Sequence, residues 1–285
     1  MLEIKAIGDY VAKWGEGPLW WDDALHYVDI EGHNVIRLHP ETGEEEVWPV
    51  NERVGMVVPR EKGGFLIGGD NGLQFLDPAS GELEAIVNPE ADLPDNRFND
   101  GKCSPDGRFF AGTISLTKTE GAATLYCLNP DLSIDRAFEN VTNSNGLAWD
   151  SDGTTLYYID SPRKHVLAFP YSADDGSLGE PKVVVDTSNI DSTPDGMTMD
   201  AEGKLWIAFC HGSCVRRFCP QSGEELQVID LPVMETTSVA FGGPDYSDLY
   251  VTTGIHKTEI EDKAGRIFRI RGLGIKGLPP HSFKG

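Results

Sequence analysis

The sequence has few cysteines, few basic residues and no long apolar run, and each shortage excludes a class of protein. Five cysteines occur in 285 residues and none forms a Cys-x-x-Cys pair, so we expect reduced thiols rather than a disulfide scaffold. Only 24 Lys and Arg face 46 Asp and Glu, giving a net charge of −22. Such a surface repels phosphate backbones and anionic lipids, and no apolar stretch could span a bilayer. We therefore expect neither a nucleic-acid nor a membrane partner.

The first ten residues also lack the apolar region of a signal peptide, which predicts a cytoplasmic protein. We expect it to be a monomer or a weak dimer.

Three of the cysteines, Cys210, Cys214 and Cys219, cluster around His211 and raise the question of zinc. The run 205–210, however, has the composition of a strand that enters a hairpin at 211–213. Buried or half-buried thiols are therefore favoured over a metal here.

One short pattern, a variable residue followed by a small one at the start of a predicted strand, recurs six times. The interval is roughly 40–50 residues, which is typical of a repeat architecture. The small residues are Gly17, Gly55, Gly101, Gly146, Gly196 and Ser238. The position before them, which we call the landmark, carries Glu16, Val54, Asp100, Asn145, Asp195 and Thr237.

A second pattern, Pro-x-Thr/Ser-Gly-Glu, follows the landmark at a nearly constant spacing, at 40–44, 78–82 and 220–224. Proline and glycine in this order predict tight turns between strands. Short runs of β-branched and aromatic residues lie between the turns, and no amphipathic helix of ordinary length is evident. Six repeats of about four strands predict an all-β, six-bladed β-propeller. We expect one domain over residues 1–285, with the segment 4–11 supplying a strand that closes the last blade.

The landmark begins the innermost strand of each blade, so ring closure should bring its side chains together at the mouth of a central channel. Glu16, Asn145 and Asp195 then offer two carboxylates and an amide oxygen. Ca²⁺, Mg²⁺ and Mn²⁺ favour such ligands, and Zn²⁺ also accepts carboxylates. Each residue alone would more often be structural, bonded to nearby backbone. Three oxygen donors in register across repeats favour one divalent metal site with positions open to water or substrate.

The third repeat is ambiguous. Asp100 occupies the landmark, but strand alternation would point Asn99 and Arg97 in the opposite direction from it, and either set could face the channel. Arg97 could donate hydrogen bonds to a polyol or a carboxylate. It could equally be a surface arginine beside acidic residues.

Several motifs together resemble the regucalcin (senescence marker protein) and gluconolactonase family. They are GEGPLW at 15–20, NRFNDGK at 96–102, SNGLAW at 144–149, PDGM at 194–197, DAEGKLW at 200–206 and GLGIKG at 272–277. The resemblance implies a six-bladed propeller that acts as a divalent-metal-dependent sugar lactonase. It implies that Glu16, Asn145 and Asp195 are the metal ligands, that Asp195 also accepts a proton, and that Arg97 and Asn99 hold sugar hydroxyls.

One departure concerns the substrate. The regucalcins place an acidic contact just after the strand that contains residues 111–113, where this chain has Ile114-Ser115-Leu116-Thr117 followed by Glu120. Our leading hypothesis is hydrolysis of a sugar lactone such as gluconolactone, in which the metal polarises the carbonyl and Asp195 assists the attacking water. The alternative is a non-enzymatic Ca²⁺-binding regulatory protein or propeller scaffold. A propeller hydrolase of phosphotriesters or apolar lactones is disfavoured, because all seven histidines miss the landmark.

Overall fold

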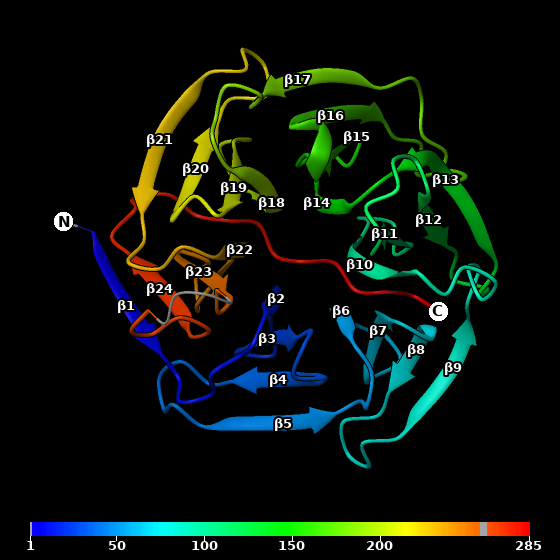
Figure 1. Ribbon diagram of the computed structural model, residues 1–285, viewed down its shortest axis with the longest axis horizontal. Helices are drawn as coiled ribbons and strands as arrows, with labels where there is room; N and C mark the ends of the chain where they lie inside the picture. Colours follow the sequence, from blue (N-terminus) through cyan, green and yellow to red (C-terminus); the bar gives the residue numbers. More distant parts are fainter. Residues whose placement is uncertain (1, 257–260) are drawn as a thin grey trace.

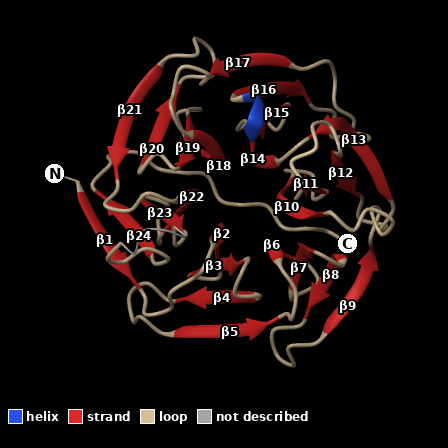
Figure 2. Cartoon of the chain, viewed as in Figure 1, coloured by secondary structure: helices blue, strands red, loops and turns tan. Residues whose placement is uncertain are grey.

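The computed structural model describes residues 2–256 and 261–285. Six four-stranded antiparallel sheets stand around a central axis, as Figure 1 shows, which confirms the predicted six-bladed β-propeller. Figure 2 shows that strands make up nearly all of the regular structure. In the described residues the one helix is the short 3₁₀ helix η1 (Ser161–Arg163). No helix in this part of the chain has the length and apolar character needed to cross a bilayer.

In blades one to five the strands follow chain order from the axis outward. Blade one contains β2 (Gly15–Trp21), β3 (Ala24–Asp29), β4 (Asn34–Leu38) and β5 (Glu45–Pro49). Blade two contains β6 (Val54–Pro59), β7 (Phe65–Gly69), β8 (Gly72–Leu76) and β9 (Leu83–Val87). Blade three contains β10 (Asn96–Cys103), β11 (Phe109–Ser115), β12 (Ala123–Leu128) and β13 (Ile134–Val141). Blade four contains β14 (Ser144–Trp149), β15 (Thr155–Asp160), β16 (His165–Pro170) and β17 (Lys182–Asp186). Blade five contains β18 (Thr193–Met199), β19 (Leu205–Cys210), β20 (Cys214–Phe218) and β21 (Glu225–Asp230).

The two ends of the chain share blade six. It contains β22 (Thr236–Gly242), β23 (Asp248–Thr253) and β24 (Ile267–Arg271), and β1 (Glu3–Ile7) is its outermost strand. β1 runs antiparallel to β24, with Ile7 opposite Ile267. The predicted closure of the last blade by the N-terminal segment is therefore confirmed. It ties the first strand to the last repeat and covers the outer edge of β24.

Apolar side chains between adjacent blades hold the ring together. In the described residues the core divides into clusters that each span two neighbouring blades. One of them joins Ile159 of β15 to Met197 and Ile207 of blade five. Inner strands such as β6 are continuously buried, whereas outer strands such as β17 leave most side chains exposed to water. This gradient explains the apolar inner runs and mixed outer runs of the sequence.

Crowding at the axis requires a glycine after most of the landmarks. Every inner strand breaks its register with the next strand near this position, as between Asn145 and Leu147. A Cβ on Gly146 would lie 2.7 Å from the carbonyl oxygen of Asp195 in the neighbouring blade, and one on Gly55 would overlap the backbone of Asn99. Bulges of this kind re-aim side chains, and beside them Glu16, Asn145 and Asp195 reach the mouth of the channel.

The C-terminal residues 272–285 cross the opposite end of the ring, where Figure 1 shows them as the red segment that passes the axis. We call them the C-terminal strap. Its backbone pairs with the turns that follow the inner strands: the Ala201 amide donates to Lys276, the Phe283 amide to Pro59 and the Lys284 amide to Gly107. Because these turns lie at the far ends of the inner strands, the strap closes the mouth opposite the landmark.

Candidate metal centre and substrate cavity

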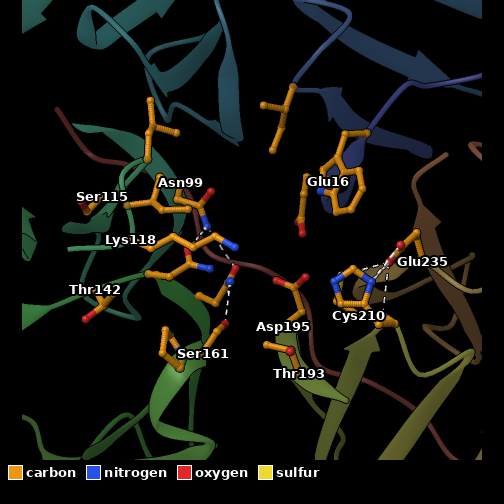
Figure 3. A pocket seen from close by; sticks show the side chains of 18 of the residues that line it. Glu16, Asn99, Ser115, Lys118, Thr142, Ser161, Thr193, Asp195, Cys210 and Glu235 are labelled. Atoms are coloured by element: carbon orange, nitrogen blue, oxygen red, sulfur yellow. Dashed lines mark hydrogen bonds and ion pairs between the residues drawn. The ribbon is translucent and has the colours of Figure 1, made fainter. Parts of the chain in front are cut away.

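The landmark mouth holds a cavity of about 1570 Å³. All five predicted site residues line it: Glu16 from β2, Arg97 and Asn99 from β10, Asn145 from β14 and Asp195 from β18. Figure 3 shows the side chains of Glu16 and Asp195 pointing toward one another across this space. Ring closure therefore gathers residues that are distant in sequence at one place.

Glu16 and Asp195 form the acidic part of the cavity. Burial, together with the charges of Asp195 and Asp100, raises the pKa of Glu16. Burial, together with the charges of Asp100 and Glu235, raises the pKa of Asp195. Neither carboxylate forms an ion pair with a lysine or arginine in the described part of the chain. Buried carboxylates without a cationic partner are costly unless a cation joins them.

Hydrogen bonds at both ends of the side-chain amide fix the orientation of Asn145. Its Nδ2 donates to Ser161 Oγ at 2.8 Å, and its Oδ1 accepts from Asn99 Nδ2 at 3.2 Å. Ser161, the first residue of η1, in turn donates to the carbonyl of Pro194 at 2.8 Å. One hydroxyl thus links Asn145 to the residue before Asp195. Sequence reasoning missed Ser161, which follows β15 and belongs to no repeat landmark.

The ambiguity of the third repeat ends in favour of Arg97 and Asn99, which line the cavity, whereas Asp100 does not. The pairing of β10 with β11 slips between Phe98 and Asp100, so Asn99 is the bulged residue. Arg97 Nη1 donates to Asn99 Oδ1 at 2.8 Å, while Arg97 Nε is buried with no hydrogen-bond partner in the described structure. Burial lowers the pKa of Arg97 to about 10, which still leaves it charged at neutral pH.

The loop after β11 forms one rim of the cavity and contributes Leu116, Lys118 and Glu120. It occupies the place where the sequence departs from the regucalcin pattern. Figure 3 shows Lys118 reaching into the cavity from the side opposite Glu16 and Asp195. Within the described residues, no hydrogen bond or ion pair engages its ammonium group. A cation thus faces the two carboxylates across the space where a ligand would lie.

The opposite wall carries Cys210, His211, Glu235 and His256. Cys210 ends β19, His211 begins the hairpin that the sequence predicted, and Glu235 immediately precedes β22. Of the cysteines around His211, only Cys210 joins this group. All five cysteines are free, four buried and Cys219 half-buried. Sequence reasoning missed Glu235. No histidine occupies the landmark, but His211 and His256 line the cavity.

The donor set at the mouth fits a divalent cation. Glu16 and Asp195 offer carboxylate oxygens and Asn145 an amide oxygen, which are hard ligands suited to Ca²⁺, Mg²⁺ or Mn²⁺. The carboxylates repel one another, and Asp100, whose pKa burial raises to about 6, adds to that repulsion. A bound cation would relieve this repulsion.

The raised pKa values of Glu16, Asp100 and Asp195 predict how the stability of the metal-free protein depends on pH. A carboxyl whose pKa is raised in the folded state keeps protons that the unfolded chain has lost, so stability falls as pH rises through the folded pKa. For Asp100 alone, a shift from 3.8 to about 6 corresponds to a total loss on the order of 3 kcal/mol, of which roughly half falls above pH 5. The melting temperature of chelator-treated protein should therefore be lower at pH 8 than at pH 5, and Ca²⁺ should raise it more at pH 8.

The variant Glu16→Gln provides the control for this experiment, because it removes one of the repelling charges and keeps the shape of the side chain. Its melting temperature should change less between pH 5 and pH 8 than that of the wild type. Equal changes in melting temperature between pH 5 and pH 8 for the two proteins would contradict the electrostatic description of the mouth.

A ring of six blades whose inner strands bring two carboxylates and an amide to one mouth defines a propeller with a candidate divalent-metal centre. The family model described as "SMP-30/Gluconolactonase/LRE-like region" matches residues 14–255, and the chain belongs to this family. It is 42% identical to regucalcin of Danio rerio over 280 residues, which cover 95% of each chain. It also superposes on the calcium-binding regucalcin of Agrobacterium tumefaciens with a TM-score of 0.94 at 26% identity, covering 100% of this chain and 98% of that one. For a luciferin-regenerating enzyme the TM-score is 0.93 at 29% identity, covering 100% of both chains.

Proposed function

We propose that this protein hydrolyses sugar lactones to the corresponding sugar acids, with a divalent metal held by Glu16, Asn145 and Asp195. The observation that carries the proposal is the convergence of two buried carboxylates and an oriented amide oxygen in one cavity. Membership of the gluconolactonase-like family supports it. The open side of the cavity leaves room for a substrate the size of a sugar.

Oxygen donors alone favour Ca²⁺, Mg²⁺ or Mn²⁺ over Zn²⁺ at this site. The Agrobacterium relative is described as calcium-binding, which supports Ca²⁺. When bound, such an ion would supply Lewis acidity at the lactone carbonyl. Two ligands come from strands whose positions Ser161 ties together, since it bonds to Asn145 and to the carbonyl before Asp195. The chain thus fixes the ligands before the cation arrives, as efficient sites require.

Asp195 would accept a proton from the water that attacks the lactone carbonyl carbon. A carboxylate that also binds a cation is a weak base, but Asp100 and Glu235 add negative charge beside Asp195. Their negative charges raise the pKa of Asp195 and so offset part of the loss of basicity that a bound cation causes. The proton would then pass to the ring oxygen as the carbon–oxygen bond of the ester breaks, which leaves a hydroxyl and a carboxylic acid on the opened sugar. The acid then releases its own proton to solvent.

Arg97, Asn99 and Lys118 would hold the hydroxyl groups of the sugar. The unpaired Nε–H of Arg97 is a buried donor that a ligand oxygen could satisfy, and leaving it unsatisfied costs free energy. Lys118 adds an ammonium group on the rim opposite the carboxylates. These donors suit a polyol and do not suit an apolar lactone.

Acid release from a panel of aldonolactones, measured with and without a chelator, tests the proposal. We expect at least one aldonolactone to open well above the uncatalysed rate. We also expect chelation to abolish that activity, and a divalent ion to restore it, because the carbonyl then loses and regains its electrophilic partner. Long-chain apolar lactones serve as the control and should remain close to the blank.

The panel also separates the main alternative, a non-enzymatic calcium-binding protein, which the description of the Agrobacterium relative favours. Such a protein would bind Ca²⁺ at the same oxygen ligands and open none of the lactones. Calcium binding without acid release from any aldonolactone would therefore overturn the enzymatic proposal and leave the metal site standing.

A further inference from the structure

The wall of the cavity beside Asp195 carries donors of a different chemical kind from the mouth. Cys210 Sγ lies 3.2 Å from Glu235 Oε2, and His211 Nδ1 lies 2.8 Å from a carboxylate oxygen of Glu235. The sulfur, imidazole and carboxylate donor atoms all lie within 4.8 Å of one another. They come from two separate segments, the end of β19 and the residue before β22, which meet only because blades five and six are adjacent.

The carboxylate of Glu235 has imidazole partners instead of a lysine or an arginine. Its side chain is buried, with 1% of its surface exposed. The backbone amide of His211 and the Cys210 thiol donate to it, and the rings of His211 and His256 lie within 2.8 and 3.8 Å. No lysine or arginine of the described chain pairs with it. A buried carboxylate surrounded by a thiol and imidazoles, with a second carboxylate nearby at Asp195, is an environment that attracts a cation.

We propose that Cys210, His211 and Glu235 form a second metal site, selective for a borderline-soft divalent ion such as Zn²⁺ or Co²⁺. Thiolate, imidazole and carboxylate are the ligands that zinc combines, and three protein ligands leave a fourth position open. Zinc bonds of about 2.0–2.3 Å place tetrahedral ligand atoms about 3.5 Å apart. The separations here, from 2.8 Å up to 4.8 Å, bracket that value, so small rotations of the side chains suffice.

This site differs from the mouth in ligand class and therefore in the ion that it prefers. Hard ions favour the oxygen ligands of Glu16, Asn145 and Asp195, and sulfur favours softer ions. Binding releases the thiol proton of Cys210 to solvent, because the thiolate is the ligand. Since the three residues line the same cavity, an ion here would present its open position to the space where a ligand lies. The inference does not depend on lactonase activity.

Cobalt titration of the metal-stripped, full-length protein tests the site. Co²⁺ bound to a thiolate gives a sulfur-to-cobalt charge-transfer band in the near ultraviolet, and oxygen-only sites do not. We expect one equivalent of Co²⁺ to produce this band and Zn²⁺ to displace it. The band should persist in Glu16→Gln, which alters only the mouth, and should disappear in Cys210→Ser.

Two further variants make the result decisive. Cys219 is the most exposed cysteine, and hydrogen bonds from Ser222 lower its pKa to about 7, so it could bind cobalt adventitiously. The band should be unchanged in Cys219→Ser. His211→Ala, whose ring is 56% exposed and whose loss should not unfold the protein, should weaken cobalt binding at least about tenfold. Absence of the band in the wild type, its survival in Cys210→Ser, or its loss in Cys219→Ser would overturn the proposal.

Discussion

Replacing Asp195 with alanine is expected to lower lactone turnover by at least about a thousandfold while the protein remains folded. The substitution removes a metal ligand and the proposed proton acceptor together, and each such contribution is worth roughly two or more orders of magnitude. Folding should survive, because burial beside like charges makes the Asp195 carboxylate a liability in the metal-free protein. Initial rates of acid release from the best aldonolactone, together with a thermal unfolding curve, give the answer.

Asp191→Ala is the matched control. It removes a carboxylate from the connection that leads into β18, but Asp191 is exposed and lies outside the cavity lining. Its rate should equal that of the wild type. An Asp195→Ala protein that retains even a tenth of the wild-type rate would contradict the role of Asp195. So would an Asp191→Ala protein with an equally severe loss, because the defect would then reflect net charge.

The second large effect concerns the C-terminal strap. Phe283 is fully buried and packs against Phe75, with ring centroids 6.4 Å apart, in the cluster between blades two and three. Phe283→Ala should lower the free energy of unfolding by about 3–5 kcal/mol, as expected for removing a buried ring and leaving a cavity. Chemical denaturation followed by tryptophan fluorescence measures this change.

Lys284→Ala controls for the position in the chain, because its side chain is exposed and only its backbone amide bonds to Gly107. That variant should unfold within about 0.5 kcal/mol of the wild type. If Phe283→Ala has the same denaturation midpoint as the wild type, the strap does not hold blades two and three together. Its closure of the mouth opposite the landmark then contributes nothing to stability.

Much of the fold could be predicted from the sequence because its repeats indicate where the turns and the inner strands lie. The turns at Gly43, Gly81 and Gly223 adopt positive φ angles of 75–78°, as the Pro-x-Thr/Ser-Gly-Glu pattern required, and each joins the third strand of a blade to the fourth. The spacing of the landmark located the inner strands. The C-terminal strap was not foreseen, since residues 272–285 carry no repeat pattern and find their partners in turns of four different blades.

The place of Glu16, Asn145 and Asp195 in the cavity lining could be predicted from the landmark, whereas other lining residues were harder to foresee. The third repeat could not be resolved from residue spacing alone, because the bulge at Asn99 changes which side chains face the cavity. Glu235 was missed although a signal exists. The position two residues before the landmark also faces the cavity at Trp14, Asn143 and Thr193, as strand alternation allows. The loop that bears Lys118 follows no repeat, so its reach into the cavity depends on tertiary structure.

The most direct test of the central claim, that Glu16, Asn145 and Asp195 hold one catalytic cation, is an anomalous difference map from crystals soaked in Mn²⁺. Manganese prefers oxygen ligands, so we expect the strongest peak among these three side chains, within bonding distance of all of them. A map with no peak there, or with its only peak at Cys210, His211 and Glu235, would contradict the metal centre and the lactonase mechanism derived from it.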